Sequence, residues 1–337
     1  MTAPLLSVRD LTVEFPTRRG TLTALDRISF EIARGEVLGV VGESGAGKSV
    51  TGAAVIGLID PPGRIAGGEV RLAGERIDNL EPEALRRVRG KRIGVIFQDP
   101  LTSLNPLFRI GDQLVETIRT HTDLSAAAAR KRAIDLLAEV GISAPERRID
   151  GYPHQFSGGM RQRVVIALAL CADPELVIAD EPTTALDVSV QAQIITVLKG
   201  MCRDHGTAVM LVTHDMGVIG ETADRVAVMY AGRIIEIGRV AEVVGGPLHP
   251  YARGLMGAIP TLADTADRLA SIPGSMPRLS AIPPGCPFNP RCPHAYEPCF
   301  TIRPDLIEPM LGERAPAGHA VACHLYDPTL APKAVAA

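Results

Sequence analysis

The stretch Gly42-Glu43-Ser44-Gly45-Ala46-Gly47-Lys48-Ser49 has the spacing G-x-x-x-x-G-K-S. An apolar run at residues 36–41 precedes it and predicts a buried strand, and the apolar residues 50–58 that follow predict a buried helix. Strand, glycine loop and helix in this order form the context that separates a phosphate-binding loop from a chance match. The competing interpretation, a glycine turn capped by a serine, explains neither flank. The sequence therefore predicts a site for nucleotide phosphates.

The residue types of this loop suit the chemistry of phosphate. Glycines let the backbone turn its N–H groups inward around a β-phosphate, and the N-terminus of the following helix adds partial positive charge. Lys48 can reach the β- and γ-phosphates, and the Ser49 hydroxyl can ligate Mg²⁺. The nucleotide contacts that we expect from this region are Gly42, Ser44, Gly45, Ala46, Gly47, Lys48, Ser49 and Val50.

The composition limits the class of protein. With 337 residues, of which 46% are hydrophobic, the chain can bury a full core and carry an appendage. A net charge of −3 gives no basic surface for nucleic acid or an anionic membrane. No apolar run approaches the roughly 18 residues that span a bilayer, and residues 1–7 lack the features of a secretory signal. We therefore expect a cytoplasmic chain, which could still dock on a membrane partner.

The residues on either side of the glycine loop predict strands. Residues 6–15 and 28–32 alternate polar with apolar, which is typical of antiparallel strands. Phe15 is a candidate to stack on a purine ring, although an aromatic residue at a strand end more often packs in the core. A shorter strand is expected at 70–73 and a charged helix at 82–89.

A helical block follows the next strand. The strand at residues 92–97 delivers Gln98 into a loop at 99–106, where two prolines are expected to exclude helix. Apolar residues at three- and four-residue spacings predict helices between 110 and about 141. Ser157 is placed as the N-cap of a further helix. We expect a helical subdomain, about residues 99–170, inserted between strands of the sheet.

Two later strands end in polar side chains. Residues 176–179 lead to Asp180 and Glu181, and residues 208–213 lead to His214. The carboxyl ends of parallel strands are where ligands bind in open α/β sheets. Alone, the carboxylates could form a solvated turn and the histidine could be structural, but a phosphate loop in the same chain favours a site. The remaining predicted elements are a helix at 188–202 and a hairpin of strands at 225–230 and 233–237.

Taken together, these pieces resemble the nucleotide-binding subunit of an ABC transporter. The resemblance implies an α/β fold of the P-loop NTPase type, with a mixed sheet core, an inserted helical subdomain and an antiparallel β subdomain, and it implies ATP hydrolysis. The signature sequence departs from L-S-G-G-Q, with phenylalanine first and Met160 last. The matching motifs are residues 42–49 (Walker A), Gln98 (Q-loop), 156–160 (signature), 176–180 (Walker B), 185–187 (D-loop) and His214 (switch histidine).

A narrower resemblance is to the oligopeptide/dipeptide importer branch. Residues 97–106, 180–188 and 249–251 and the cysteine-bearing tail carry it. It implies an ATPase that energises peptide import from the cytoplasmic side of the membrane, with nickel or another small solute as an alternative cargo. It also implies three kinds of partner: a second, non-identical ATPase subunit, two membrane permease subunits and an extracytoplasmic substrate-binding protein. A homodimer stays open. We divide the chain into a nucleotide-binding domain, 1–258, and an extension, 259–337.

The resemblance implies a role for each matching residue. Glu181 would polarise the attacking water, and His214 would contact the γ-phosphate. Asp180 would support the Mg²⁺ held by Ser49, and Gln98 would sense ion and water while linking them to the helical block. The residues expected to serve the nucleotide of a facing subunit are Ser157, Gly158 and Gly159, with Asp187 in the D-loop.

The tail contains prolines from residue 260 onward and is expected to form neither regular sheet nor helix. Its cysteines are Cys286, Cys292, Cys299 and Cys323. Zinc sites usually carry tight C-x₂₋₄-C pairs, which are missing, whereas wider loops with prolines suit an iron–sulfur cluster. The resemblance also points to a [4Fe–4S] cluster. Zinc and unligated thiols stay open, and Cys171 and Cys202 are expected to be ordinary buried thiols.

Other classes of ABC protein fit less well. Those of DNA repair or translation carry long coiled-coil insertions, zinc hooks or tandem cassettes, and this chain has a single cassette and no basic surface. A catalytically silent subunit is disfavoured because Glu181 and His214 are both present.

Overall fold

The computed structural model describes residues 3–183, 188–258, 271–309 and 318–331. Its centre is a seven-stranded mixed sheet in the order β11-β10-β9-β3-β8-β7-β6, in which β9, β3, β8, β7 and β6 run parallel. The strands are β3 (Val37–Val41), β6 (Ile93–Ile96), β7 (Leu176–Asp180), β8 (Ala208–Val212), β9 (Arg225–Tyr230), β10 (Arg233–Arg239) and β11 (Ala320–Val321).

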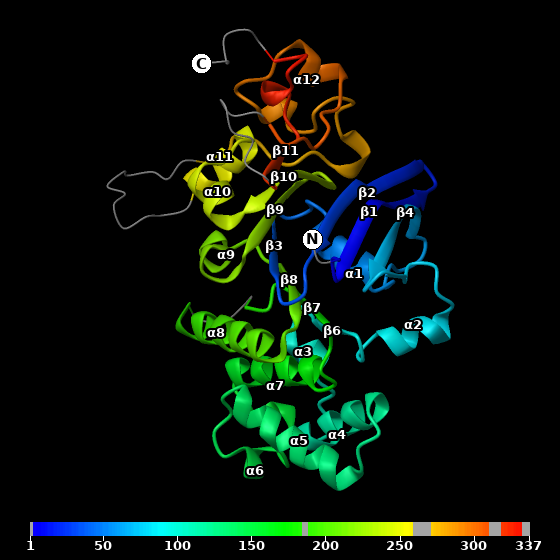
Figure 1. The fold of residues 1–337 in the computed structure, drawn as a ribbon, viewed down its shortest axis with the longest axis vertical. Helices are drawn as coiled ribbons and strands as arrows, with labels where there is room; N and C mark the ends of the chain where they lie inside the picture. The colour runs from blue at the N-terminus through cyan, green and yellow to red at the C-terminus, as the bar shows by residue number, and fades with distance from the viewer. Residues whose placement is uncertain (1–2, 184–187, 259–270, 310–317, 332–337) are drawn as a thin grey trace.

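A second, antiparallel sheet lies beside the first and has the order β2-β1-β4-β5 (Figure 1). Its strands are β1 (Leu6–Thr17), β2 (Gly20–Ile32), β4 (Arg64–Leu72) and β5 (Glu75–Arg76). The prediction of antiparallel β1 and β2 is confirmed, although both are longer than expected. The strand predicted at 70–73 was too short. The pairing register between β1 and β4 shifts at Gly67, and Gly68 takes a φ of 85°, so the glycine pair bulges the strand instead of ending it.

The helices fall into two groups (Figure 1). One group, α3 to α7, contains the predicted helical block, and α4 and α5 confirm the helices expected between 110 and 141. Of the others, α1, α9 and α10 pack against the central sheet, α8 packs against α7 and α9, and α12 lies in the C-terminal extension. The helices are α1 (Lys48–Val55), α2 (Pro82–Val88), α3 (Pro100–Ser103), α4 (Ile110–His121), α5 (Ala126–Glu139), α6 (Pro145–Arg148), α7 (Gly158–Leu170), α8 (Val188–His205), α9 (Met216–Thr222), α10 (Val240–Gly245), α11 (Pro250–Gly257) and α12 (Glu297–Thr301).

Two predictions about irregular backbone were wrong. The loop at 99–106 was expected to exclude helix, but it contains α3. Pro100 is its first residue, where a missing N–H costs nothing, and the Thr102 and Ser103 hydroxyls donate to the Asp99 carbonyl. The tail was expected to lack regular structure, but α12 and β11 form there. Its prolines lie outside β11, and the one in α12 occupies the first turn of the helix.

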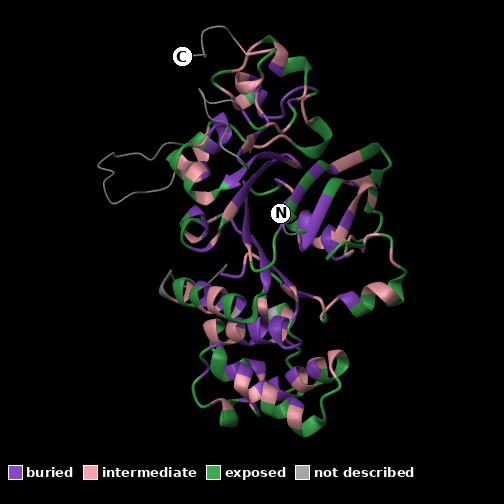
Figure 2. Ribbon diagram, in the orientation of Figure 1, coloured by how far each residue is buried: buried purple, intermediate pink, exposed green. Residues whose placement is uncertain are grey.

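Apolar side chains alternate between the two faces of the central sheet. Along β8, Val209 and Leu211 face a core shared with α7 to α11, while Met210 and Val212 face a core shared with α1 and the antiparallel sheet. Parallel strands that are covered on both faces read as continuous apolar runs, which explains why these strands could be predicted. Figure 2 shows the sheet as the buried centre of the molecule. Among the described residues, no helix has the length and apolar character needed to cross a bilayer.

The tail is joined to the central sheet. β11 pairs with β10 through Glu236↔Val321 and Ile237↔Ala320. The Glu236 side chain is fully buried, and its carboxylate accepts hydrogen bonds from the Leu248 N–H at 2.9 Å and the His249 N–H at 2.7 Å. His319 Nε2, from the tail, lies 2.8 Å from the same carboxylate. The extension thus packs as a continuation of the sheet.

Candidate nucleotide site

The phosphate loop connects β3 to α1 as predicted. Gly42, Gly45 and Gly47 all have positive φ values, of 151°, 83° and 104°. A Cβ at Gly42 would lie 2.3 Å from the Met229 carbonyl oxygen, so only glycine fits there. The loop is therefore held close to β9, and α1 begins at Lys48 with its N-terminus directed at the loop.

Lys48 is 7% exposed, and its ammonium group donates to two carbonyls of the loop itself. The Nζ atom lies 2.8 Å from the Gly42 oxygen and 3.2 Å from the Glu43 oxygen. Burial lowers the pKa of Lys48, while the charges of Glu181 and Asp180 act in the opposite direction. This places a cation, already desolvated, at the centre of the loop.

Ser49 and Asp180 come together from α1 and β7. The Ser49 hydroxyl donates to Asp180 Oδ1 at 3.0 Å. Burial raises the pKa of Asp180, and the neighbouring Glu181 carboxylate raises it further against the hydrogen bond from Ser49. A hydroxyl and a carboxylate side by side form an oxygen donor set of the type that Mg²⁺ prefers.

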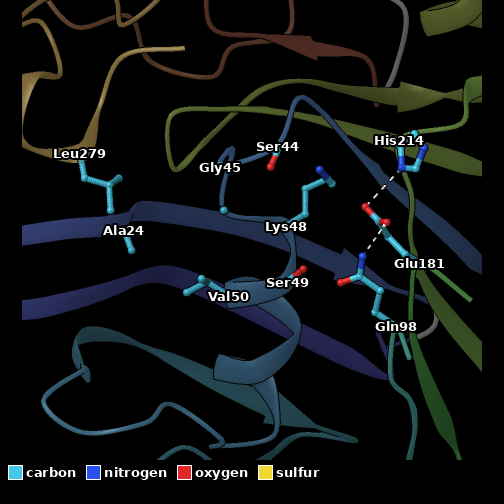
Figure 3. A pocket seen from close by; sticks show the side chains of 11 residues that line it. Ala24, Ser44, Gly45, Lys48, Ser49, Val50, Gln98, Glu181, His214 and Leu279 are labelled. Atoms are coloured by element: carbon cyan, nitrogen blue, oxygen red, sulfur yellow. Dashed lines mark hydrogen bonds and ion pairs between the residues drawn. The ribbon is translucent and has the colours of Figure 1, made fainter. Parts of the chain in front are cut away.

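Glu181 lies between two side chains from separate parts of the chain (Figure 3). Gln98 Nε2 donates to Glu181 Oε2 at 3.1 Å, and His214 Nδ1 lies 3.3 Å from Oε1. Glu181 has a left-handed φ of 46°, and its N–H donates to the Val212 carbonyl at 2.8 Å. This unusual conformation turns the carboxylate toward Lys48 and across to His214.

A single cavity joins these groups (Figure 3). It contains no side-chain contribution from Phe15, which lies on β1 and packs against the antiparallel sheet. Gly42, Ala46 and Asp180 are not among its lining residues; the first two belong to the phosphate loop, and Asp180 is the last residue of β7. The residues that line the cavity are Ala24, Ser44, Gly45, Gly47, Lys48, Ser49, Val50, Gln98, Glu181, His214 and Leu279.

The signature residues lie apart from this cavity. Ser157 caps α7 as predicted, with its hydroxyl accepting from the Met160 N–H at 3.4 Å. Ser157 and Gly158 are exposed, and Gly159 approaches α8 so closely that a Cβ there would lie 2.7 Å from Val190 Cγ1. These residues therefore present a helix N-terminus to the outside. Asp187 lies outside the described residues.

The four tail cysteines line a second, smaller cavity together with His249 and Phe288. All are free thiols. Burial raises the pKa of Cys286 to about 11 and that of Cys323 to about 12. Among the described residues, no three His, Cys, Asp or Glu side chains are arranged to hold one metal ion, so the expected cluster gains no direct support there. Cys171 and Cys202 are buried in the main core, as predicted.

Some residues at the site were not predicted from the sequence. Ala24 and Leu279 line the cavity, and Tyr251 and Arg291 contact the phosphate loop at Glu43. Tyr251 belongs to the His-Pro-Tyr stretch that helped to carry the family resemblance, so the sequence did mark this residue as a candidate. Nothing in the local sequence connects Leu279 or Arg291 to a loop more than two hundred residues away.

The fold and this cavity define an ATP-binding cassette. Residues 25–184 match the family described as ABC transporter, and residues 235–299 match the C-terminal region of the oligopeptide/dipeptide transporter family. The chain therefore belongs to the ABC transporter ATPases, in their oligopeptide/dipeptide branch.

Several relatives and solved structures are similar to this chain. A putative peptide import ATP-binding protein of Brucella abortus is 49% identical, over 93% of this chain and 94% of the relative. The oligopeptide transport ATP-binding protein OppD of Escherichia coli is 48% identical, over 89% of each chain. The dimeric structure of a bacterial ABC transporter cassette is 28% identical with a TM-score of 0.63, covering 70% of this chain and 98% of that one.

Proposed function

We propose that this chain is the ATP-hydrolysing subunit that energises an importer of di- or oligopeptides. The observation that carries the proposal is Glu181, held between Gln98 and His214 at the mouth of a phosphate loop. A carboxylate with two hydrogen-bonding neighbours and free access to a cavity is suited to orient a water molecule for in-line attack. The names of the relatives favour peptide as the cargo.

In this proposal the loop holds the phosphates. Lys48, which donates to loop carbonyls in the present structure, would exchange them for β- and γ-phosphate oxygens. Mg²⁺, where bound, neutralises charge that develops on the phosphates. Ser49 would hold the ion directly. Asp180, whose Oδ1 accepts from the Ser49 hydroxyl, and Gln98, which lines the cavity, would support it. Phe15 is proposed as the purine contact because it is an aromatic residue shortly before the phosphate loop in the sequence.

Glu181 and His214 would share the chemical step. Glu181 would accept hydrogen bonds from the attacking water, and His214, 66% exposed at its side chain, would contact the γ-phosphate and help to orient that water. Gln98 stands at the start of the helical block, so its bond to Glu181 would report the state of the site to that block.

The outward-facing helix N-terminus at α7 supports a dimer. Exposed N–H groups at the start of a helix bind anions, and Ser157, Gly158 and Gly159 would meet the γ-phosphate held by a facing ATPase subunit. Asp187 would act at the same interface. We propose a non-identical homologue as the facing subunit, and the dimeric cassette structure supports dimerisation of similar chains in general.

A groove between the sheet and the helical block supports docking on a membrane permease. It is lined by residues of β6, α3, α4 and α7 and includes Leu58 and Phe97, which are 42% and 50% exposed. Phe97 immediately precedes Gln98, so a permease segment in this groove would lie one residue from the site. The chain would thus work at the cytoplasmic face of the membrane with two permease subunits and an extracytoplasmic substrate-binding protein.

We also propose a [4Fe–4S] cluster at Cys286, Cys292, Cys299 and Cys323. The four sulfurs surround one cavity, and each iron of such a cluster takes only one thiolate, so no three of them need converge on one ion. Iron–sulfur bonds, where formed, cross-link the extension. Iron and sulfide analysis of anaerobically purified protein, with Cys299→Ser as the comparison, tests this, and colourless protein with one zinc per chain would refute it.

For the organisation of the chain we propose a nucleotide-binding domain, 1–258, with the helical subdomain inserted at about 99–170, and an extension, 259–337. The extension contributes β11 and His319 to the sheet of the domain. The boundary would therefore divide two parts that fold against one another.

Uptake by cells that lack the gene tests the proposed function. We expect wild type to restore uptake of a labelled dipeptide or a longer peptide, and Glu181→Gln to bind ATP yet restore none. Glu83→Gln is the matched control, because it makes the same chemical change on the exposed face of α2. Rescue of peptide uptake by Glu181→Gln would refute the catalytic role assigned to Glu181. If wild type restored nickel uptake alone, the cargo would be nickel and not a peptide.

A further inference from the structure

Glu43 is the one acidic residue within the phosphate loop, and it is held at three points. Its backbone N–H donates to the Tyr251 hydroxyl at 2.9 Å. Its carbonyl accepts from Lys48 Nζ at 3.2 Å and from the Ala46 N–H at 3.1 Å. Its carboxylate accepts from Arg291 Nη1 at 3.0 Å. The conformation of the loop at this residue therefore depends on α11 and on the extension.

Arg291 is built into the extension as a fixed cation. Its side chain is only 6% exposed. Nε donates to the Pro273 carbonyl at 2.8 Å, Nη2 to the Ile272 carbonyl at 3.3 Å, and the guanidinium lies 5.9 Å from the ring centroids of Tyr230 and Phe288. Burial acts to lower the pKa of Arg291, but its hydrogen bonds to Glu43 and Tyr230 outweigh that and raise it.

A carboxylate in a loop that receives a polyphosphate is an electrostatic disadvantage. Like charges repel, and the repulsion grows where protein excludes water, as it does around a partly buried group. The Glu43 side chain is 30% exposed, so solvent screens it incompletely. An arginine whose orientation is fixed by two backbone carbonyls can neutralise this charge without being drawn onto the phosphates itself.

We propose that Arg291 is a positioning residue for the phosphate site. Its guanidinium holds and neutralises the Glu43 carboxylate, so that the loop can accept the phosphates of ATP. This inference rests on the proposed function, namely that nucleotide phosphates bind in this loop. It gives the extension a direct part in nucleotide affinity, through a side chain adjacent in sequence to Cys292.

The test measures binding of MgATP and of adenosine to the full-length chain by calorimetry or competition. We expect Arg291→Gln to weaken MgATP binding about fivefold, more at low salt than at high salt, because an unpaired carboxylate is left beside the loop. Adenosine carries no phosphate and should bind as to wild type. The double variant Glu43→Gln/Arg291→Gln should return MgATP affinity to within about twofold of wild type, because the repelling charge is gone.

Arg303→Gln is the matched control. Arg303 also belongs to the extension and pairs with a core carboxylate, Asp26 on β2, outside the phosphate loop. Its loss removes the same charge from the same part of the chain and should leave MgATP affinity unchanged.

Each other outcome has a distinct meaning. MgATP affinity that is unchanged in Arg291→Gln, or that stays low in the double variant, overturns the inference. If Arg291→Gln does not fold, Glu43→Gln decides alone: it should bind MgATP more tightly than wild type, and equal or weaker binding overturns the inference. Lys48→Ala separates the two proposals, because MgATP binding that survives it would overturn the proposed phosphate site itself.

Discussion

The carboxylate of Glu236 joins β10 to the segment before α11 and, through His319, to the extension, and replacing it by leucine should be severe. Glu236→Leu removes the acceptor for the Leu248 N–H, the His249 N–H and His319 Nε2, all in buried surroundings. A buried donor without a partner costs about 1–3 kcal/mol, so the three together amount to roughly 3–9 kcal/mol. We expect the free energy of unfolding to fall by about 5 kcal/mol, a large share of the total stability of a domain.

Urea unfolding followed by far-ultraviolet circular dichroism measures this loss, since the chain has no tryptophan to report it by fluorescence. Glu236→Gln should lie between the leucine variant and wild type, because its amide oxygen still accepts hydrogen bonds. Glu83→Gln is the control: Glu83 and its partner Arg86 are 63% and 69% exposed at their side chains, and the change should cost less than about 0.5 kcal/mol. A leucine variant as stable as this control would refute the reasoning.

Three further predictions concern the site, the docking groove and the packing of the sheet. Lys48→Ala should abolish detectable binding of a fluorescent ATP analogue, because the change removes the cation of the loop. Retained binding of the analogue would contradict this prediction. Phe97→Glu should leave ATP binding intact and reduce co-purification with the permease, because it puts a charge into the apolar groove, and equal recovery would speak against docking there. Gly94→Ala should lower the thermal midpoint by several degrees, because its Cβ would lie 2.2 Å from the Ala169 carbonyl, whereas Gly200→Ala, with open space around it, should not.

The parts that could be predicted from the sequence are those set by local pattern. The phosphate loop, the apolar strands and the N-cap at Ser157 depend on neighbouring residues and appear where expected. Asp180, Glu181 and His214 could be placed near the loop because strands of one parallel sheet end at the same edge.

The rest depended on contacts between distant residues or on exceptions to local rules. Proline forbids a helix interior but suits its first turn, which is why α3 was missed. Arg291 lies 248 residues from Glu43, and no periodicity connects them. The tail gains its order from pairing with β10 and from packing Phe288 against Tyr230 and Tyr251.

The pairing of β11 with β10 also matters for how this protein is produced and handled. A shortened chain that stopped after α11 would leave the outer hydrogen-bonding edge of β10 uncovered, along with the apolar surface beneath Phe288. An open edge strand is a template for a strand of another molecule, and such exposure leads to aggregation. We therefore expect a chain without the extension to aggregate more readily, and a minimal ATPase for expression should retain it.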